Sequence, residues 1–574
     1  MHKLTSDLPH TSHPASRVLR LASQETRFSM RWYIARNLVS APLASSIFPL
    51  LLCLVLTVAC CPAMPPTPTP PCTLTPVHTP TPTLSETDTP APTPTPQPDD
   101  VATASATSDS PFSDHAPALR GDFLADLELF PDATRYEIEL TVDPSMTVIT
   151  GHERVAYTNT EDVPLADLYL RLFPNTPGYG GAMTAHNVSV DGEPTVPVDE
   201  LGGSAVRIPL DPPLEPGASL DLVLDFTLEV PTEGDLGYRQ LGYYDGYLAL
   251  ANAYPLVPVY DDEGWNVEVA PTHGDAVYSE TAFYTVHLSA PEEMTLLASG
   301  TCSAPEPNPG AGVTWTCVTG PMRDFVAVLG PEYQVASHTV EGVTVNSAFY
   351  AKPPRNTEGG ARALDYASEA ARLFSARFGL YPFTELDVVE TPTRAGGIEY
   401  PGLVVINSGY YETLSDRMEW VVVHEVGHQW WYSLVGNDQV DEPWLDEALV
   451  QYSTLLYYEN RYGTELAAEL LEGVFEQAHE DLITSGRDAS VGLPVAAYSG
   501  EDYGPVVYQK GPLYFHALRQ EVGEEDFWAI LQTYFTLNRY GVATPEDWLA
   551  AVEAVTGDEH RALYEQWIWG TEER

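Results

Sequence analysis

The segment His424–His428, with the sequence HEVGH, constrains the fold more than any other part of this chain. It lies between two apolar stretches, DRMEWVVV and QWWYSLVG, so we expect it to lie in a helix. Residues four positions apart share one face of a helix, so His424 and His428 present two imidazoles to the same point. Two imidazoles at this spacing favour a zinc site. Glu425, beside the first histidine, is placed to accept a proton from water there.

A third ligand distinguishes a metal site from two histidines that merely pack together. After the loop GNDQVDEP, the sequence WLDEALVQYSTLLYYE predicts a second helix, and Glu447 lies at its start. Two antiparallel helices joined by this loop would bring Glu447 beside His424 and His428. Two His and one Glu, with a fourth position left to water, form a catalytic zinc site, whereas a structural site would favour cysteines.

Four pieces of the sequence, in this order, resemble the M1 family of zinc aminopeptidases, which are gluzincins. Gly396–Tyr400 (GGIEY) resembles the family's G-x-M-E-N exopeptidase motif, and HEVGHQWW and WLDEALVQY resemble its zinc-binding helices. Tyr508, in VVYQKGPLYFHAL, resembles the catalytic tyrosine of its Y-x-K-G segment. The resemblance extends from about residue 135 to the C-terminus and is weak over the first, β-rich part.

The resemblance implies one Zn²⁺ per chain and a catalytic role for two further side chains. The implied metal ligands are His424, His428 and Glu447. Glu425 is implied as the general base, and Tyr508 as a hydrogen-bond donor to the tetrahedral oxyanion.

The resemblance also implies a site for the free amino terminus of a peptide. Glu399 would accept a charge-assisted hydrogen bond from the α-ammonium group. Gly396 and Gly397 beside it would let the backbone approach the substrate closely. Three positions depart from the family pattern: Ile398 replaces Met, Tyr400 replaces Asn, and Asp446, just before the third ligand, replaces Asn.

The function that follows is a zinc-dependent aminopeptidase that hydrolyses the N-terminal residue from peptides. A zinc endopeptidase, which needs no amine anchor, stays an alternative, as does a catalytically inactive, surface-displayed binding protein on the same fold. Larger family members continue into a helical C-terminal domain. This sequence ends after the catalytic domain, so we expect a more open site.

The predicted fold is multidomain. Near-alternating segments such as RYEIELTV and SLDLVLDFTLEV predict an antiparallel, saddle- or sandwich-like β domain over residues 116–330. Residues 331–574, with amphipathic patterns such as EGGARALDYASEAARLFSARFG, predict a mainly helical, thermolysin-like catalytic domain. Cys302 and Cys317 bracket a Pro/Gly-rich turn, and we favour a disulfide over two free thiols.

The N-terminal part predicts export. Residues 1–61 contain a basic flank and the apolar run IFPLLLCLVLTVA before Cys60, the layout of a signal peptide or lipoprotein cleavage site. An uncleaved membrane anchor is the alternative. Residues 62–115 are rich in Pro and Thr and predict a disordered stalk. We therefore expect an exported, extracellular or cell-surface protein that reaches the membrane only through this segment or a lipid.

The charge of the chain excludes one class of partner. The formal net charge is −54 at pH 7. Nucleic acids and anionic membrane surfaces bind clustered Lys and Arg, so neither is an expected partner, and peptide substrates remain. The sequence leaves the oligomeric state open.

Overall fold

The structure is a computed structural model that describes residues 112–232, 236–350 and 355–571. Within these ranges, no helix combines the length and apolar character that crossing a bilayer requires. The export segment predicted for residues 1–61 lies outside the described residues, as does the predicted stalk as far as residue 111. Residues 112–115, the end of that stalk prediction, belong to the folded part, because Phe112 and His115 are buried.

Alternating buried and exposed residues form the large sheet of the first half. Strands β1 (Arg135–Val142), β2 (Val148–Thr158) and β8 (Ser219–Glu229) are antiparallel neighbours, and about every second side chain is buried. One face therefore packs on a core while the other meets water. The sheet has nine strands in the order β15-β17-β13-β1-β2-β8-β4-β5, with β16 beside β17. The remaining strands are β4 (Ala182–Val190), β5 (Glu193–Pro194), β13 (Phe283–Ala290), β15 (Thr301–Cys302), β16 (Glu306–Asn308) and β17 (Gly312–Val318).

Smaller sheets complete the first half. One has the order β14-β18-β10-β9, a second β3-β7-β6, and a third pairs β11 with β12. The disulfide between Cys302 and Cys317 joins β15 to β17, so the favoured pairing is confirmed. The strands of these sheets are β3 (Leu165–Arg171), β6 (Val198–Glu200), β7 (Ala205–Leu214), β9 (Leu241–Tyr244), β10 (Tyr247–Ala251), β11 (Tyr260–Asp261), β12 (Gly264–Trp265), β14 (Thr295–Ala298) and β18 (Val326–Gly330).

A mixed five-stranded sheet with the order β19-β20-β21-β23-β22 opens the second half. Helix α2 (Arg355–Arg377) connects the parallel strands β20 and β21, and β22 forms an edge of the sheet. The sequence pattern placed the change from strands to helices near residue 331, but β19 and β20 continue the strands to residue 350. Only the two end residues of β19 are buried, so it lacks the apolar alternation that marks a strand. The five strands are β19 (Tyr333–Val340), β20 (Val343–Tyr350), β21 (Glu385–Thr391), β22 (Gly397–Ile398) and β23 (Leu403–Asn407).

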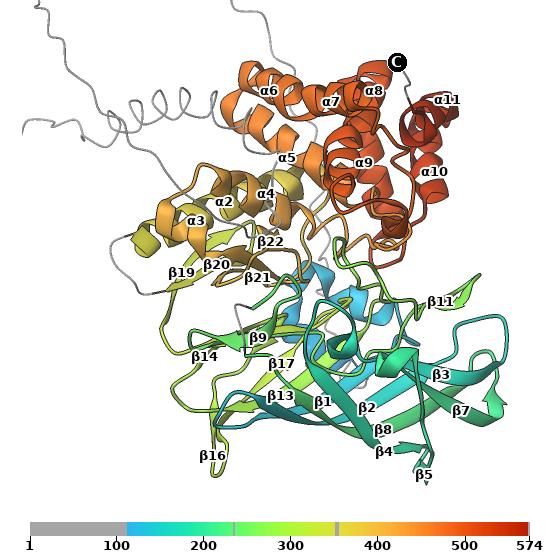
Figure 1. The fold of residues 1–574 in the computed structure, drawn as a ribbon, viewed down its shortest axis with the longest axis vertical. Coiled ribbons are helices and arrows are strands. Elements are labelled where there is room, and N and C mark those ends of the chain that lie inside the picture. The colour runs from blue at the N-terminus through green and yellow to red at the C-terminus, as the bar shows by residue number, and fades with distance from the viewer. Residues whose placement is uncertain (1–111, 233–235, 351–354, 572–574) are drawn as a thin grey trace, which may run out of the picture. The chain divides into compact units, whose positions relative to one another are not determined.

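Helices form the rest of the second half, and they appear in Figure 1 in gold, orange and red, apart from the blue and green strands of the first half. The predicted fold class, a β domain followed by a mainly helical domain, is confirmed. A π-helical stretch at Leu471–Glu476 interrupts the helical segment over residues 464–485. The helices are α3 (Ser408–Thr413), α4 (Arg417–Gly427), α5 (Glu447–Tyr462), α6 (Thr464–Leu470), α7 (Gln477–Ser485), α8 (Pro512–Val522), α9 (Glu524–Asn538), α10 (Pro545–Thr556) and α11 (Arg561–Tyr564).

A buried arginine ties the two halves together. Arg323, which precedes β18, donates hydrogen bonds to the carbonyl oxygens of Tyr432 (2.9 Å) and Gly541 in the helical half. It also donates to the carbonyl of Ser279 in the β half at 3.0 Å. Hydrogen bonds from a charged donor are about twice as strong as neutral ones, so Arg323 fixes the β half against the helices that carry the candidate site.

Candidate metal and substrate site

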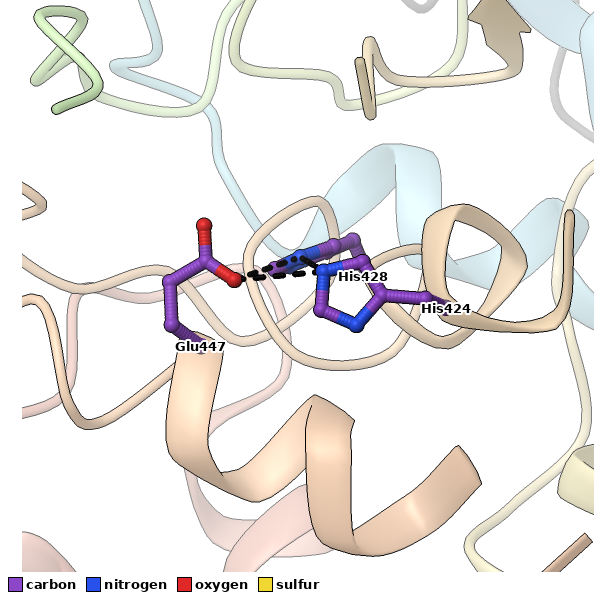
Figure 2. A group of neighbouring side chains, drawn as sticks. All are labelled: His424, His428 and Glu447. Atoms are coloured by element: carbon purple, nitrogen blue, oxygen red, sulfur yellow. Dashed lines mark hydrogen bonds and ion pairs between the residues drawn. The ribbon is translucent and has the colours of Figure 1, made fainter. Parts of the chain in front are cut away.

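The structure brings the three predicted metal ligands together (Figure 2). His424 lies on the last turn of α4, His428 directly follows that helix, and Glu447 is the first residue of α5. The two Nε2 atoms are 3.2 Å apart, and Oε2 of Glu447 lies 3.2 Å from His424 Nε2 and 3.4 Å from His428 Nε2. Tetrahedral zinc with ligands at about 2.0–2.2 Å requires ligand atoms about 3.3–3.6 Å apart. The triangle therefore fits a single zinc ion.

Hydrogen bonding around the triangle leaves its inner atoms free for a metal. His428 Nδ1 lies 3.0 Å from the carbonyl oxygen of Trp431, which fixes the proton on Nδ1 and directs the Nε2 lone pair into the triangle. Oε2 of Glu447 is buried and accepts no hydrogen bond from the described residues. A buried carboxylate oxygen without a donor is costly, and a cation at this point removes the cost.

Helix α4 is shorter than the apolar sequence indicated. It ends at Gly427 instead of continuing through QWW, because the chain turns after His428 and buries Trp430 and Trp431 in the core. His428 has helical backbone angles, so its side chain still lies one helical turn after that of His424, on the same face.

Glu425 lies against the edge strand β22. A Cβ atom placed on Gly397 would stand 2.4 Å from Oε1 of Glu425, so only glycine lets this strand pass so close to the carboxylate. The Glu425 side chain is buried, and burial, followed by repulsion from Glu399, raises its pKa well above the ordinary value. A raised pKa suits a carboxylate that accepts a proton and later returns it. A Cβ atom placed on Gly396, in contrast, would meet nothing closer than the hydroxyl of Tyr410 at 3.5 Å.

Tyr508 reaches the metal ligands from a π-helical turn, Gly504–Lys510. Its hydroxyl donates to Oε1 of Glu447, and its ring lies 6.1 Å from the ring of His424, centroid to centroid. Lys510 of the same segment is buried and donates to Asp488 Oδ1 at 2.7 Å, which anchors the turn. The phenol is thus held beside two of the three predicted metal ligands.

Glu399, just after β22, is buried and connected to the third ligand by a glutamine that the sequence analysis missed. Gln439 Nε2 donates to Glu399 Oε1 at 3.1 Å and to Asp446 Oδ2 at 2.8 Å. Asp446 in turn caps α5, because its Oδ1 accepts from the backbone N–H of Glu447 at 2.8 Å. Burial raises the pKa of Asp446 to about 7. The residue that departs from the family pattern therefore positions the third ligand.

A second missed residue comes from the β half. Asp275 lies in a loop before β13, and its carboxylate, with those of Glu399 and Glu447, forms a group whose oxygens lie within 4.8 Å of one another. It accepts a hydrogen bond from the Tyr238 hydroxyl at 3.3 Å. Burial, followed by repulsion from Glu399 and Glu447, raises the pKa of Asp275. Carboxylates gathered in this way favour a cationic guest such as an ammonium group. No motif marks Asp275, so only the fold could reveal it.

Gln429, two residues after the end of α4, forms hydrogen bonds with the loop between β22 and β23, which contains Tyr400. Its Nε2 donates to the carbonyl oxygen of Tyr400 at 3.1 Å, and its Oε1 accepts from the N–H of Gly402 at 2.8 Å. The residue after His428 therefore fixes the loop that carries Glu399. Tyr400, which replaces the family's Asn, is buried and donates its hydroxyl to the carbonyl of Arg239.

The eight site residues predicted from the sequence gather around one cavity of about 290 Å³; His428 belongs to the group through His424 and Glu447 but is not part of the cavity lining. The remaining seven line the cavity, together with residues from α4, α5 and the β half. The lining consists of Tyr238, Asp275, Gly396, Gly397, Glu399, Tyr410, Arg417, Trp420, Val421, His424, Glu425, Glu447, Gln451 and Tyr508.

Part of the chain is similar to a known family. Residues 362–567 match the Peptidase family M1 domain. Aminopeptidase M1 of Arabidopsis thaliana is 27% identical over 251 residues, which is 42% of this chain and 28% of that protein. Aminopeptidase M1-A of Oryza sativa subsp. japonica is 23% identical over 470 residues, 77% of this chain and 49% of that protein. The chain thus spans about half or less of the length of these relatives.

Solved structures share the fold. The M1 zinc metallopeptidase from Deinococcus radiodurans has a TM-score of 0.58 and 22% sequence identity, over 77% of this chain and 94% of that one. A mutant of the same protein, described as bound to a Tyr-Ser-Ala substrate, has a TM-score of 0.58 and 21% identity, over 77% of this chain and 95% of that one.

Proposed function

We propose that this chain, in which residues 362–567 match the Peptidase family M1 domain, is a zinc-dependent aminopeptidase that removes the N-terminal residue from peptides. The observation that carries the proposal is the triangle of His424, His428 and Glu447, with ligand atoms 3.2–3.4 Å apart and Glu425 beside it. The names of the relatives, and the peptide in the Deinococcus radiodurans structure, support a peptide substrate.

The metal would be held by His424 Nε2, His428 Nε2 and Glu447 Oε2. Bound there, Zn²⁺ would polarise the scissile carbonyl and make water acidic enough to attack near neutral pH. The carboxylate of Glu425 accepts the proton of the attacking water and delivers it to the nitrogen of the leaving amine, so one residue serves as base and then as acid.

Tyr508 stabilises the charge that develops on the carbonyl oxygen. Its hydroxyl, which donates to Glu447 in this structure, turns its hydrogen bond toward the oxyanion. Removing such a donor from an oxyanion site typically costs about 2.7–4 kcal/mol.

The acidic residues proposed to bind the substrate's amino group distinguish an exopeptidase from an endopeptidase. Glu399 and Asp275 accept hydrogen bonds from the α-ammonium group, and Gln439 holds Glu399 in place. An ammonium held there puts only the first peptide bond beside Glu425. An endopeptidase does not require an acidic site for a free amino group. An inactive binding protein does not require a general base beside three intact metal ligands.

Hydrolysis of alanyl-anilide by the full chain tests this function, with N-acetyl-alanyl-anilide and a chelator as comparisons. We expect hydrolysis of the free-amine substrate only, its loss on chelation, and its recovery with zinc. Glu425→Gln should abolish it while leaving zinc bound. Equal hydrolysis of the acetylated compound would favour the endopeptidase, and no hydrolysis of either would favour the binding protein.

We further propose that the protein acts outside the cytoplasm, attached to the membrane through its N-terminal segment or a lipid. The apolar run before Cys60 and the Pro/Thr-rich segment support this, and so does the disulfide between Cys302 and Cys317, since such bonds persist in oxidising compartments. Fractionation of cells that express the full chain, with metabolic labelling by a fatty-acid analogue, tests it. Recovery of the protein in the cytosolic fraction would contradict it.

A further inference from the structure

The cavity that holds the candidate active site has one basic end that no motif explains. Arg417 is the first residue of α4, seven positions before His424, and residues spaced by seven lie on the same face of a helix. Arg417, Val421 and His424 therefore follow one another along the cavity, and all three line it. Among the described residues of that lining, Arg417 is the only one with a permanent positive charge.

The guanidinium of Arg417 forms no ion pair with the described residues, and its buried Nη2 donates no hydrogen bond to any of them. The side chain lies beside Tyr410, a neutral partner: burial raises the pKa of the Tyr410 hydroxyl, and the charge of Arg417 and a hydrogen bond with it oppose the rise. In a chain with a formal net charge of −54, an arginine that faces a cavity without an acidic partner is an available anion site.

The opposite end of the cavity is acidic. Asp275, Glu399 and Glu447 gather where the peptide amine is proposed to bind. Glu399 also lies near His428, the ligand at the far end of α4 from Arg417. Along α4 from its C-terminal end, the acidic residues proposed to bind the peptide amine therefore come first, the predicted metal ligands next, and Arg417 last. A short peptide has the same polarity, with an ammonium at one end and a carboxylate at the other.

The spacing sets the length of peptide that fits. Seven residues of helix place the Cα atoms of Arg417 and His424 about 10.5 Å apart. An extended peptide advances about 3.3–3.6 Å per residue, and the arginine side chain can reach part of the way back. The carboxylate of a peptide with about two or three residues after the scissile bond would then meet the guanidinium.

We propose that Arg417 binds the C-terminal carboxylate of short peptides, so that this protein selects tripeptides and tetrapeptides with a free carboxylate. This inference rests on the proposed aminopeptidase function and adds to it a recognition site at the far end of the cleft. The interaction is a charge-assisted pair between a planar guanidinium and a carboxylate, which arginine binds through two parallel hydrogen bonds.

The test compares Ala-Ala-Ala with its C-terminal amide, which differs only in the terminal charge. We expect the wild type to prefer the free acid by about 10-fold to 100-fold in kcat/KM, mostly through KM. Arg417→Gln should bring the acid-to-amide ratio close to 1, and Arg417→Lys should give an intermediate ratio because it keeps the charge without the planar fork. Arg362→Gln, which removes the same charge from the exposed face of α2, is the matched control and should keep the wild-type ratio.

A wild-type ratio near 1, or a ratio that Arg417→Gln leaves unchanged, would overturn the proposal. If the amide of Ala-Asp-Ala regains the preference in an Arg417-dependent way, the same site also takes side-chain carboxylates, which supports carboxylate recognition. Alanyl-anilide has no carboxylate, so its hydrolysis reports on the aminopeptidase function alone. Calorimetric binding of the two Ala-Ala-Ala peptides to Glu425→Gln gives the acid-to-amide ratio without turnover, and equal affinities would refute the role of Arg417.

Discussion

Gln439 provides the sharpest test of how this site is held together, because it touches neither metal nor scissile bond. Its Nε2 donates to two buried carboxylates, Glu399 at 3.1 Å and Asp446 at 2.8 Å. Gln439→Leu keeps a similar volume and removes both hydrogen bonds. Hydrogen bonds to charged groups contribute about 1.5–3 kcal/mol each, and an unpaired buried carboxylate bears the desolvation cost. We expect the free energy of unfolding to fall by about 3 kcal/mol.

The same change should also weaken binding of the substrate's amino group, because Gln439 positions Glu399. With Glu399 no longer held, KM for alanyl-anilide should rise about 10-fold while the zinc content stays at the wild-type level. Urea unfolding and steady-state kinetics measure the two effects. Gln532→Leu is the control, since Gln532 is exposed and donates only to the carbonyl of Arg377, and its cost should stay within about 0.5 kcal/mol. A Gln439→Leu protein with KM within about 2-fold of wild type and control-like stability would refute this reasoning.

Three further outcomes follow from the geometry. Tyr508→Phe should lower kcat by about 100-fold to 1000-fold with little change in KM or bound zinc, in a steady-state assay. Gly397→Ala puts a Cβ atom 2.4 Å from the Glu425 carboxylate and should lower kcat sharply, whereas Gly396→Ala, whose nearest neighbour is at 3.5 Å, should have a much smaller effect. Burial raises the pKa of Asp387 from 3.8 to about 7, so the folded state loses stability as pH rises through this window. Asp387→Asn should therefore raise the urea midpoint near pH 8 and change it little near pH 4.

The sequence predicted the parts of the site that depend on local geometry. The spacing of His424 and His428 on a helix is a property of four residues, and Glu447 follows from a second helix that starts after a short loop. Both predictions needed only helix periodicity and a loop length. The alternation of apolar and polar residues in β1 and β8 likewise predicts strands with one buried face.

The remaining features depend on tertiary contacts that no local pattern records. Asp275 comes from a loop in the β half, and Gln439 from the loop between the zinc-ligand helices, yet both meet Glu399. The sequence does not distinguish Arg417 from other polar residues; its role follows from its place in the cavity lining with His424. The sequence did not predict strand β19, because most of its residues are exposed and show no apolar alternation.

The zinc content of the purified protein tests the central claim most directly. After dialysis against metal-free buffer, the wild type and Glu425→Gln should each retain about one zinc ion per chain, and Glu447→Ala should retain far less because it removes one of three ligands. Elemental analysis by mass spectrometry gives the numbers. A wild type without zinc, or a Glu447→Ala variant that binds zinc as tightly as the wild type, would contradict the convergence of His424, His428 and Glu447 on one metal.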